Sequence, residues 1–211
     1  MTALIIQGTP EWKALRLGRV TASRVADVLA KGKSGPSASR GNYAAQLISE
    51  RLTGVAAEGF KSAAMDWGNE KEAEARSLYE FLTEAEIAEV GFVDHPRIAM
   101  SGASPDGLVG DDGLIEIKCP NTSTHIDTLI SGTIPTKYQI QMNWQMACTG
   151  RAWCDFVSYD PRLPADMRKF VKRFPRDEIR IAETEREVRA FLAEVDATID
   201  ALRAAVIREA A

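Results

Sequence analysis

With 211 residues, the chain is long enough for one domain with a full hydrophobic core and too short for two domains of ordinary size. Apolar residues make up 45% and charged residues 27% of the sequence, as in ordinary soluble proteins, and no apolar run is long enough for a membrane span. The formal net charge of −4 weighs against a nucleic-acid partner, because binding phosphates requires Lys and Arg.

The first quarter of the chain predicts three helices. Pro10 in a first helical turn begins the segment PEWKALRLG, Thr21 caps a second helix that runs to about Ala30, and a third covers about Asn42 to Thr53. The Gly- and Ser-rich stretch from Gly32 to Gly41 predicts a mobile loop between two of them. The extreme amino terminus has no secretion signal, so the cytoplasm is the expected compartment.

This amino-terminal segment is basic, whereas acidic residues are dense between residues 177 and 200. The asymmetry leaves DNA a place to bind despite the net charge. The basic residues are Lys13, Arg16, Arg19, Arg24, Lys31, Lys33 and Arg40.

The middle of the chain predicts a helix followed by strands. The segment from Asp66 to Leu82 is rich in Ala, Glu and Leu and lacks Pro, which favours a helix. Short Val- and Ile-bearing runs separated by turn residues then predict an antiparallel meander. These runs are Glu89–Asp94, Arg97–Ser101, Pro105–Val109 and Leu114–Cys119.

A helix from about Pro135 to Thr149 and a strand from Trp153 to Tyr159 come next. This order of elements predicts an α/β or α+β domain with a mixed sheet. The last segment, from Asp177 to Ala210, predicts one long helix or two. Its apolar residues are spaced 4, 3, 4, 3, 4 in a narrow seam, which packs on its own domain or, alternatively, on another subunit. The seam consists of Val188, Leu192, Val195, Ile199, Leu202 and Val206.

The candidate chemistry lies in the segment SPDGLVGDDGLIEIKCP, residues 104–120. Asp106 begins one strand, and Glu116 and Lys118 lie on the strand that returns from a tight turn. Side chains two apart on a strand share a face, so Glu116 and Lys118 point the same way while the isoleucines beside them point into the core. The hairpin brings Asp106 opposite them.

Two carboxylates and an ammonium at a sheet edge predict a divalent cation, because burying like charges together destabilises a fold unless something offsets them. Magnesium prefers oxygen ligands including one or two carboxylates, and the carbonyl of Ile117 is a further candidate ligand. Three cysteines without C-x-x-C spacing and two histidines argue against zinc. Such an ion would polarise a scissile phosphate, with Lys118 orienting and helping to deprotonate the attacking water.

A P-D and E-x-K pattern alone is weakly specific, but several ordered blocks accompany it. They are WKALRLGRVTAS (12–23), WGNEKEAEAR (67–76), SPDGL (104–108), EIKCP (116–120), QIQMNWQ (139–145) and YDPR (159–162). From about Trp12 to Pro161, the chain resembles the phage lambda type of alkaline exonuclease, the YqaJ-like viral recombinase family with the PD-(D/E)-x-K motif. The resemblance implies one domain over residues 1–211. Its restriction-endonuclease-like core covers about 12–161, with a central mixed sheet flanked by helices, and a helical segment covers about 176–210.

The resemblance also assigns roles to site residues. It implies that Asp106 and Glu116 are metal ligands, with the Ile117 carbonyl beside them, and that Lys118 is the catalytic lysine. Glu72 matches a helix-borne glutamate near a second metal, which implies two Mg²⁺ ions per site, with Mn²⁺ as a substitute. Without the resemblance, Glu72 would be read as a solvated charge on its helix.

Further positions match DNA-binding residues of the family. Arg16, Ser23 and Ser104 match a pocket for the 5′-terminal phosphate, and an Arg fork with two hydroxyls suits a dianion. Lys33 stands where the family can place an Arg that touches the downstream duplex. Met65 matches an apolar wedge that splits the terminal base pairs, although a Met before a helix more often packs in a core.

Gln141 falls on a helix glutamine that in the family lies near the attacking water; alone it would be read as an ordinary polar helix residue. The whole resemblance implies a Mg²⁺-dependent 5′→3′ exonuclease on linear double-stranded DNA that releases 5′-mononucleotides and leaves a 3′ overhang. It further implies a homotrimeric ring around the duplex, a single-strand annealing protein as partner, and a phage or prophage gene expressed in the bacterial cytoplasm.

Two other functions compete with this interpretation. A restriction-like or structure-specific endonuclease with the same metal site would cut closed circular DNA. A non-catalytic DNA-end binding module would bind without cutting, and the joint presence of Asp106, Glu116, Lys118 and Glu72 disfavours it.

Overall fold

The computed structural model describes residues 5–33, 35–57 and 63–209, and of residues 63–65, 69 and 209 the backbone alone. The helices are α1 (Pro10–Arg16), a 3-10 turn (Ala22–Arg24), α2 (Val25–Leu29), α3 (Ala38–Thr53), α4 (Ala63–Thr83), α5 (Thr122–Ser131), α6 (Thr136–Thr149) and α7 (Glu178–Glu209). The strands are β1 (Val20–Thr21), β2 (Lys31–Gly32), β3 (Gly35–Pro36), β4 (Ile87–Ala88), β5 (Val93–Asp94), β6 (Ser101–Ala103), β7 (Gly107–Val109), β8 (Gly113–Lys118), β9 (Trp153–Tyr159) and β10 (Lys169–Pro175). No helix in these ranges is both long and apolar enough to cross a membrane.

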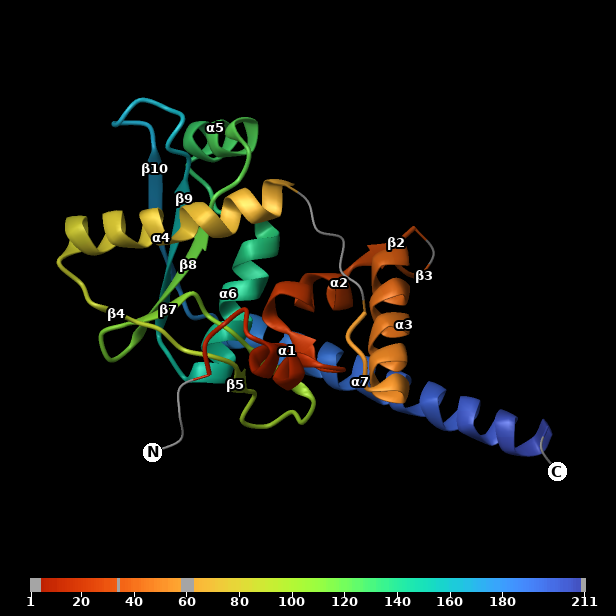
Figure 1. Ribbon diagram of the computed structural model, residues 1–211. Coiled ribbons are helices and arrows are strands. Elements are labelled where there is room, and N and C mark those ends of the chain that lie inside the picture. The colour runs from red at the N-terminus through yellow and green to blue at the C-terminus, as the bar shows by residue number, and fades with distance from the viewer. Residues whose placement is uncertain (1–4, 34, 58–62, 210–211) are drawn as a thin grey trace.

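A five-stranded mixed sheet in the order β10-β9-β8-β7-β4 organises the fold (Figure 1). β8 and β9 run parallel, and the other neighbours run antiparallel. Parallel neighbours cannot be joined by a tight turn, and α5 and α6 lie in the crossover between them. The predicted mixed sheet is confirmed, and β8, which carries Glu116 and Lys118, is its middle strand.

Helices cover both faces of this sheet. Leu114 of β8 belongs to an apolar cluster with Met142 of α6, whereas Ile115 and Ile117 belong to a second cluster with Tyr79 of α4. This alternation follows the period of two of a strand. The even-numbered side chains of β8 therefore face α6, and the predicted orientation of the isoleucines into the core is confirmed.

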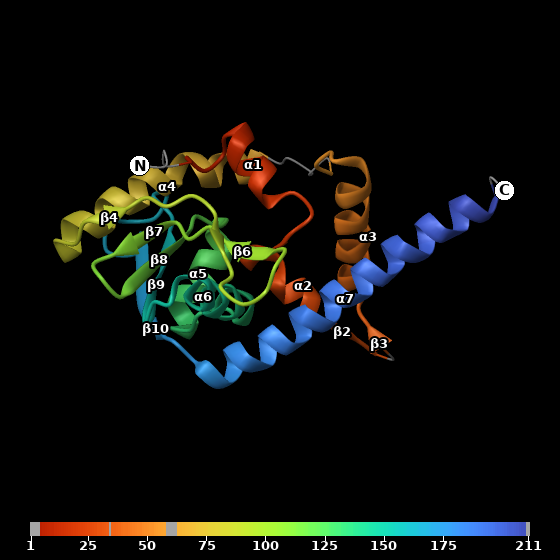
Figure 2. The same cartoon turned by 90° about the horizontal axis from the view of Figure 1, so that it is seen from below.

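The largest apolar cluster lies beside the sheet and joins α2, α3, α6 and α7 with the three-stranded sheet β1-β6-β5. α7 is one continuous helix, and Figure 2 shows it crossing the molecule and extending past α3. Its apolar seam is buried from Val188 to Ile199, as expected for packing on its own chain, but Leu202 and Val206 are exposed.

Two predictions for the amino-terminal segment were wrong. The stretch from Gly32 to Gly41 is not a loop, because β2 and β3 pair as a short hairpin and α3 begins at Ala38. Ser37 caps α3, since its Oγ accepts a hydrogen bond from the backbone N–H of Arg40 at 3.2 Å. Thr21 stands at the N-cap of the 3-10 turn but makes no side-chain capping bond.

The predicted antiparallel meander is divided between two sheets. β5 and β6 belong to the three-stranded sheet, and β7 and β8 to the five-stranded one. The predicted strand Arg97–Ser101 is a turn up to Met100, held by a hydrogen bond from the Ser101 hydroxyl to the Ile98 carbonyl at 2.9 Å. The sequence reasoning missed α5 and β10.

Candidate active site

The β7–β8 hairpin brings the predicted acidic residues and lysine together. The antiparallel register of the two strands places Asp106 beside Glu116. Asp106 Oδ2 accepts a hydrogen bond from the backbone N–H of Ile117 at 2.6 Å. Lys118, on the same strand face as Glu116, forms an ion pair with Glu116 Oε1. The three charged side chains thus converge at the end of β8.

The fully buried carboxylate of Glu116 is held by two glutamines of α6. Gln141 Nε2 donates to Glu116 Oε1 and Gln145 Nε2 donates to Glu116 Oε2, each at 2.6 Å. Residues four apart on a helix lie on one face, so α6 presents both amides to the same carboxylate. Hydrogen bonds to both oxygens fix the orientation of Glu116.

The hairpin concentrates more negative charge than its own lysine offsets. Burial raises the pKa of Asp106 well above its ordinary value, and the neighbouring charges of Glu116 and Glu72 raise it further, against the opposing effects of Lys118 and the Ile117 N–H. Burial alone would lower the pKa of Lys118, but the carboxylates of Glu116 and Asp106 outweigh burial and raise that pKa.

The donor set of the hairpin fits a hard divalent cation. Two carboxylates are the number that Mg²⁺ commonly takes from a protein, and a cation would offset the charge that raises the Asp106 pKa. Within residues 5–33, 35–57 and 63–209, no three His, Cys, Asp or Glu side chains gather closely enough to hold a metal ion. Carbonyl oxygens or water would therefore complete the coordination.

Glu72, on α4, forms its ion pair with Arg76 one helical turn further on, at 3.1 Å between Oε1 and Nη2. Its charge contributes to the raised pKa of Asp106, so it lies near enough to act on the hairpin. α4 packs against β8, so Glu72 and its partner Arg76 lie on a helix that borders the hairpin.

Two of the three residues assigned to the 5′-phosphate pocket are in contact. Arg16 Nη1 donates to the Ser104 hydroxyl at 3.4 Å, and Trp12 Nε1 donates to the same oxygen at 2.9 Å. The guanidinium of Arg16 also lies over the Trp12 ring, 4.1 Å from its centroid. Burial lowers the pKa of Arg16, against the opposing charges of Tyr43 and Glu50.

Ser23 is exposed, and its hydroxyl lies 3.5 Å from the Thr21 hydroxyl rather than on Arg16 or Ser104. β1 and β6 are parallel with Thr21 opposite Gly102, so Ser23 and Ser104 both lie two residues past the same pair. Ser23 and Ser104 therefore both follow the carboxyl ends of two neighbouring parallel strands, at the same end of the small sheet.

A model of the YqaJ-like viral recombinase domain matches residues 11–152, about two thirds of the chain. The chain belongs to this family. The matched segment contains Asp106, Glu116, Lys118 and Gln141, and ends before β9. No curated protein matches the chain.

This YqaJ-like chain is also similar to solved structures. The alkaline exonuclease LHK-Exo from Laribacter hongkongensis is 56% identical over 95% of this chain and 99% of its own, with a TM-score of 0.90 for a complex with dAMP and 0.89 for a second structure. A phage-related exonuclease from Haemophilus somnus 129PT is 16% identical over 87% of this chain and 96% of its own, with a TM-score of 0.69. At that identity the likeness shows the fold alone.

Two further positions of the YqaJ-like chain were assigned to DNA contacts. Lys33 is exposed in the turn between β2 and β3, where it faces solvent. Met65 lies in the first turn of α4, but its side chain is outside the part of the chain that the structure describes. Its wedge role stays a prediction.

The sequence alone did not identify Gln145, which lies in the same segment QIQMNWQ as Gln141. The sequence feature that could have identified Gln145 is its spacing of four residues from Gln141, which predicts that both side chains lie on one helix face. Only the packing of α6 against β8 shows that this face meets Glu116.

Proposed function

We propose that this protein is a Mg²⁺-dependent DNA exonuclease that degrades one strand of linear double-stranded DNA from its 5′ end, releasing 5′-mononucleotides and leaving a 3′ overhang. The observation that carries the proposal is the convergence of Asp106, Glu116 and Lys118 on one hairpin, with Glu116 held by two amides. The 56% identity to an alkaline exonuclease supports the same chemistry.

The proposed roles follow from the donor types. Asp106 and Glu116, with the Ile117 carbonyl beside them, would hold the cation, and Glu72 would complete the site near a second one. When bound, Mg²⁺ supplies Lewis-acid polarisation of the scissile phosphate, and Mn²⁺ can replace it. Lys118 orients the attacking water and donates to the charge that develops on the phosphate.

The direction of degradation would come from Arg16, Ser104 and Ser23. The contact between Arg16 and Ser104, and the shared end of the small sheet at which Ser23 and Ser104 lie, support a pocket for a terminal phosphate. Holding that group fixes which bond is cut, and the shortened strand re-enters after each cut. Lys33 would touch the duplex further downstream, and Met65 would separate the terminal base pair.

We also propose that three copies form a ring around the duplex, which would support processivity because rebinding becomes intramolecular. Basic residues then need only line the channel of an acidic protein. A single-strand annealing protein would load on the exposed 3′ strand.

The test is degradation of linear duplex with and without a 5′-phosphate, in Mg²⁺, in Mn²⁺ and in chelator. We expect metal-dependent loss of the 5′-phosphorylated strand and release of mononucleotides. Asp106→Ala and Lys118→Ala should abolish it, Arg16→Ala should reduce the preference for the phosphorylated end, and Asp111→Ala, an exposed carboxylate in the same hairpin, should behave as wild type.

Covalently closed circles distinguish the alternatives. An exonuclease leaves them intact, and cutting of circles would identify an endonuclease instead. Binding of DNA ends without any release of nucleotides would identify a binding module.

A further inference from the structure

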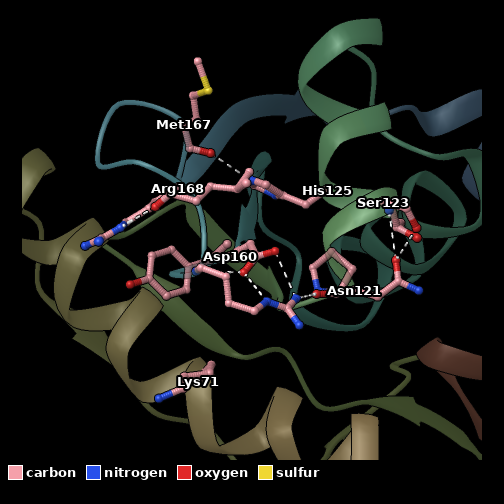
Figure 3. Close-up of polar contacts among 12 residues, drawn as sticks. Lys71, Asn121, Ser123, His125, Asp160, Met167 and Arg168 are labelled. Atoms are coloured by element: carbon pink, nitrogen blue, oxygen red, sulfur yellow. Dashed lines mark hydrogen bonds and ion pairs between the residues drawn. The ribbon is translucent and has the colours of Figure 1, made fainter.

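A buried carboxylate outside the hairpin holds an arginine in a fixed position. Asp160, which follows β9, is fully buried, and Arg162 donates to it from Nε at 2.7 Å and from Nη2 at 3.0 Å. Burial works to raise the pKa of Asp160, but hydrogen bonds from Arg162 and Thr122 lower it overall, so the carboxylate stays charged. Figure 3 shows Asp160 between Asn121, before α5, and Arg168, before β10.

The same guanidinium reaches two other segments. Arg162 Nη2 donates to the carbonyl of Pro120 at 3.1 Å, two residues after Lys118. Its Cζ lies 4.2 Å from the ring centroid of Trp67 on α4, five residues before Glu72. A bidentate ion pair and a stack on an indole both depend on the planar fork of arginine. One side chain thus joins the ends of β8 and β9 to the first turns of α4.

The connection that carries Arg162 is itself held against α5. His125 is fully buried, with its Nδ1 2.7 Å from the Ser158 hydroxyl. Its Nε2 lies 3.0 Å from the Met167 carbonyl (Figure 3). Because a carbonyl only accepts, Nε2 carries a proton and donates it to the Met167 carbonyl. Ser158 lies opposite Lys118 in the parallel β8–β9 ladder, so this contact is anchored to the strand that bears the lysine.

We propose that Arg162, held by Asp160, is a positioning residue for the candidate active site. It fixes the end of β8, which carries Lys118, relative to α4, which carries Glu72 five residues after Trp67. The arginine contacts Asp160, Pro120 and Trp67 rather than the hairpin carboxylates, so it acts through backbone and indole placement. The kinetic part of this inference rests on the proposed function, whereas the structural part does not.

The test combines local hydrogen exchange with kinetics on Arg162→Gln, Arg162→Lys and Asp160→Asn. We expect faster amide exchange around residues 67–72 and 119–122, unchanged exchange in α7, and kcat for linear duplex lowered about 10- to 100-fold with KM nearly unchanged. Arg162→Lys should be nearly as damaging as Arg162→Gln, because an ammonium cannot form the fork or the stack.

The matched control is Arg168→Gln. Its side chain lies on the same connection but donates to the Leu163 carbonyl rather than to Asp160, Pro120 or Trp67, so exchange and kcat should stay at wild-type values. Unchanged exchange at both segments in Arg162→Gln overturns the inference, as does a loss confined to KM, which would indicate a direct DNA contact. A wild-type protein that releases no nucleotides refutes the proposed function, while the exchange measurement still decides whether Arg162 fixes these segments.

Discussion

At the scale of single residues, Asp106 and Glu116 lie side by side on one hairpin whose charges are only partly balanced. The raised pKa of Asp106 means that the folded protein holds the Asp106 proton more tightly than the unfolded chain does. The contribution of Asp106 to the free energy of unfolding is therefore fully present below the pKa that this residue has in the unfolded chain. That contribution is lost as the pH rises through its raised pKa in the folded protein.

This sign leads to a prediction for Asp106→Asn. In chelator, the variant should be more stable than wild type at neutral pH, because it removes a partly buried charge beside Glu116 while its side-chain oxygen can still accept from Ile117. The difference in the free energy of unfolding should shrink as the pH falls towards 4, and denaturant unfolding at several pH values measures it. Mg²⁺ should raise the Tm of wild type only; an equal rise in Asp106→Asn would contradict metal binding at Asp106.

Gln145 permits a second prediction at this scale. Gln145→Ala leaves a buried carboxylate oxygen of Glu116 without its donor, which should cost about 1–3 kcal/mol of stability. Because Glu116 is then no longer held in one orientation, the affinity for Mg²⁺, measured by calorimetry, and the rate of DNA hydrolysis should both fall. Gln139→Ala is the control, since its amide donates to the Ile134 carbonyl. Equal losses in both variants would mean that Gln145 merely supports the helix.

The residues of the site differ in how far sequence predicts them. Asp106, Glu116 and Lys118 lie within one hairpin, so strand alternation and a short turn are enough to bring them together. The contacts of Gln145 and Arg162 depend on how α6, α4 and the β9–β10 connection pack, which local pattern does not determine.

At the scale of elements, long periodic segments were predictable and short or edge segments were not. α4, α6, α7 and β9 carry apolar positions repeating at the period of a helix or a strand. α5 is rich in Thr and Ser, which are weak helix formers, and it is held by its Asn121 cap and by buried His125. β10 is an edge strand that exposes Lys169 and Lys172, so its apolar signal is weak.

The seam of α7 offers a matched pair of substitutions. Val195 is 1% exposed in the apolar cluster with α2 and α3, whereas Val206 is 67% exposed on the same seam. Val195→Ala should lower the free energy of unfolding by about 1–3 kcal/mol, because it removes buried methyl groups and leaves a cavity. Val206→Ala should change it by less than about 0.5 kcal/mol. Urea denaturation of dilute protein measures both, and equal effects would contradict the packing described for α7.

At the scale of the whole molecule, membership in the YqaJ-like viral recombinase family and the acidic net charge have to be reconciled with DNA as substrate. We expect light scattering to give three times the mass of one chain. Hydrolysis should continue after an excess of trap DNA is added, because a ring stays threaded on its duplex. A monomer whose activity stops at once on addition of the trap would contradict the ring.

The far end of α7 has a consequence of its own. Its last turns extend past α3 and expose Leu202, Val206 and Ile207 (Figure 2). Helical turns without tertiary packing are only marginally stable in water, so we expect these turns to fray in an isolated chain and to become rigid when a neighbour covers them. The rate of deuterium uptake at the end of α7 would then report the oligomeric state without any added label. Fast uptake would indicate a monomer, and slow uptake would indicate a chain within an oligomer.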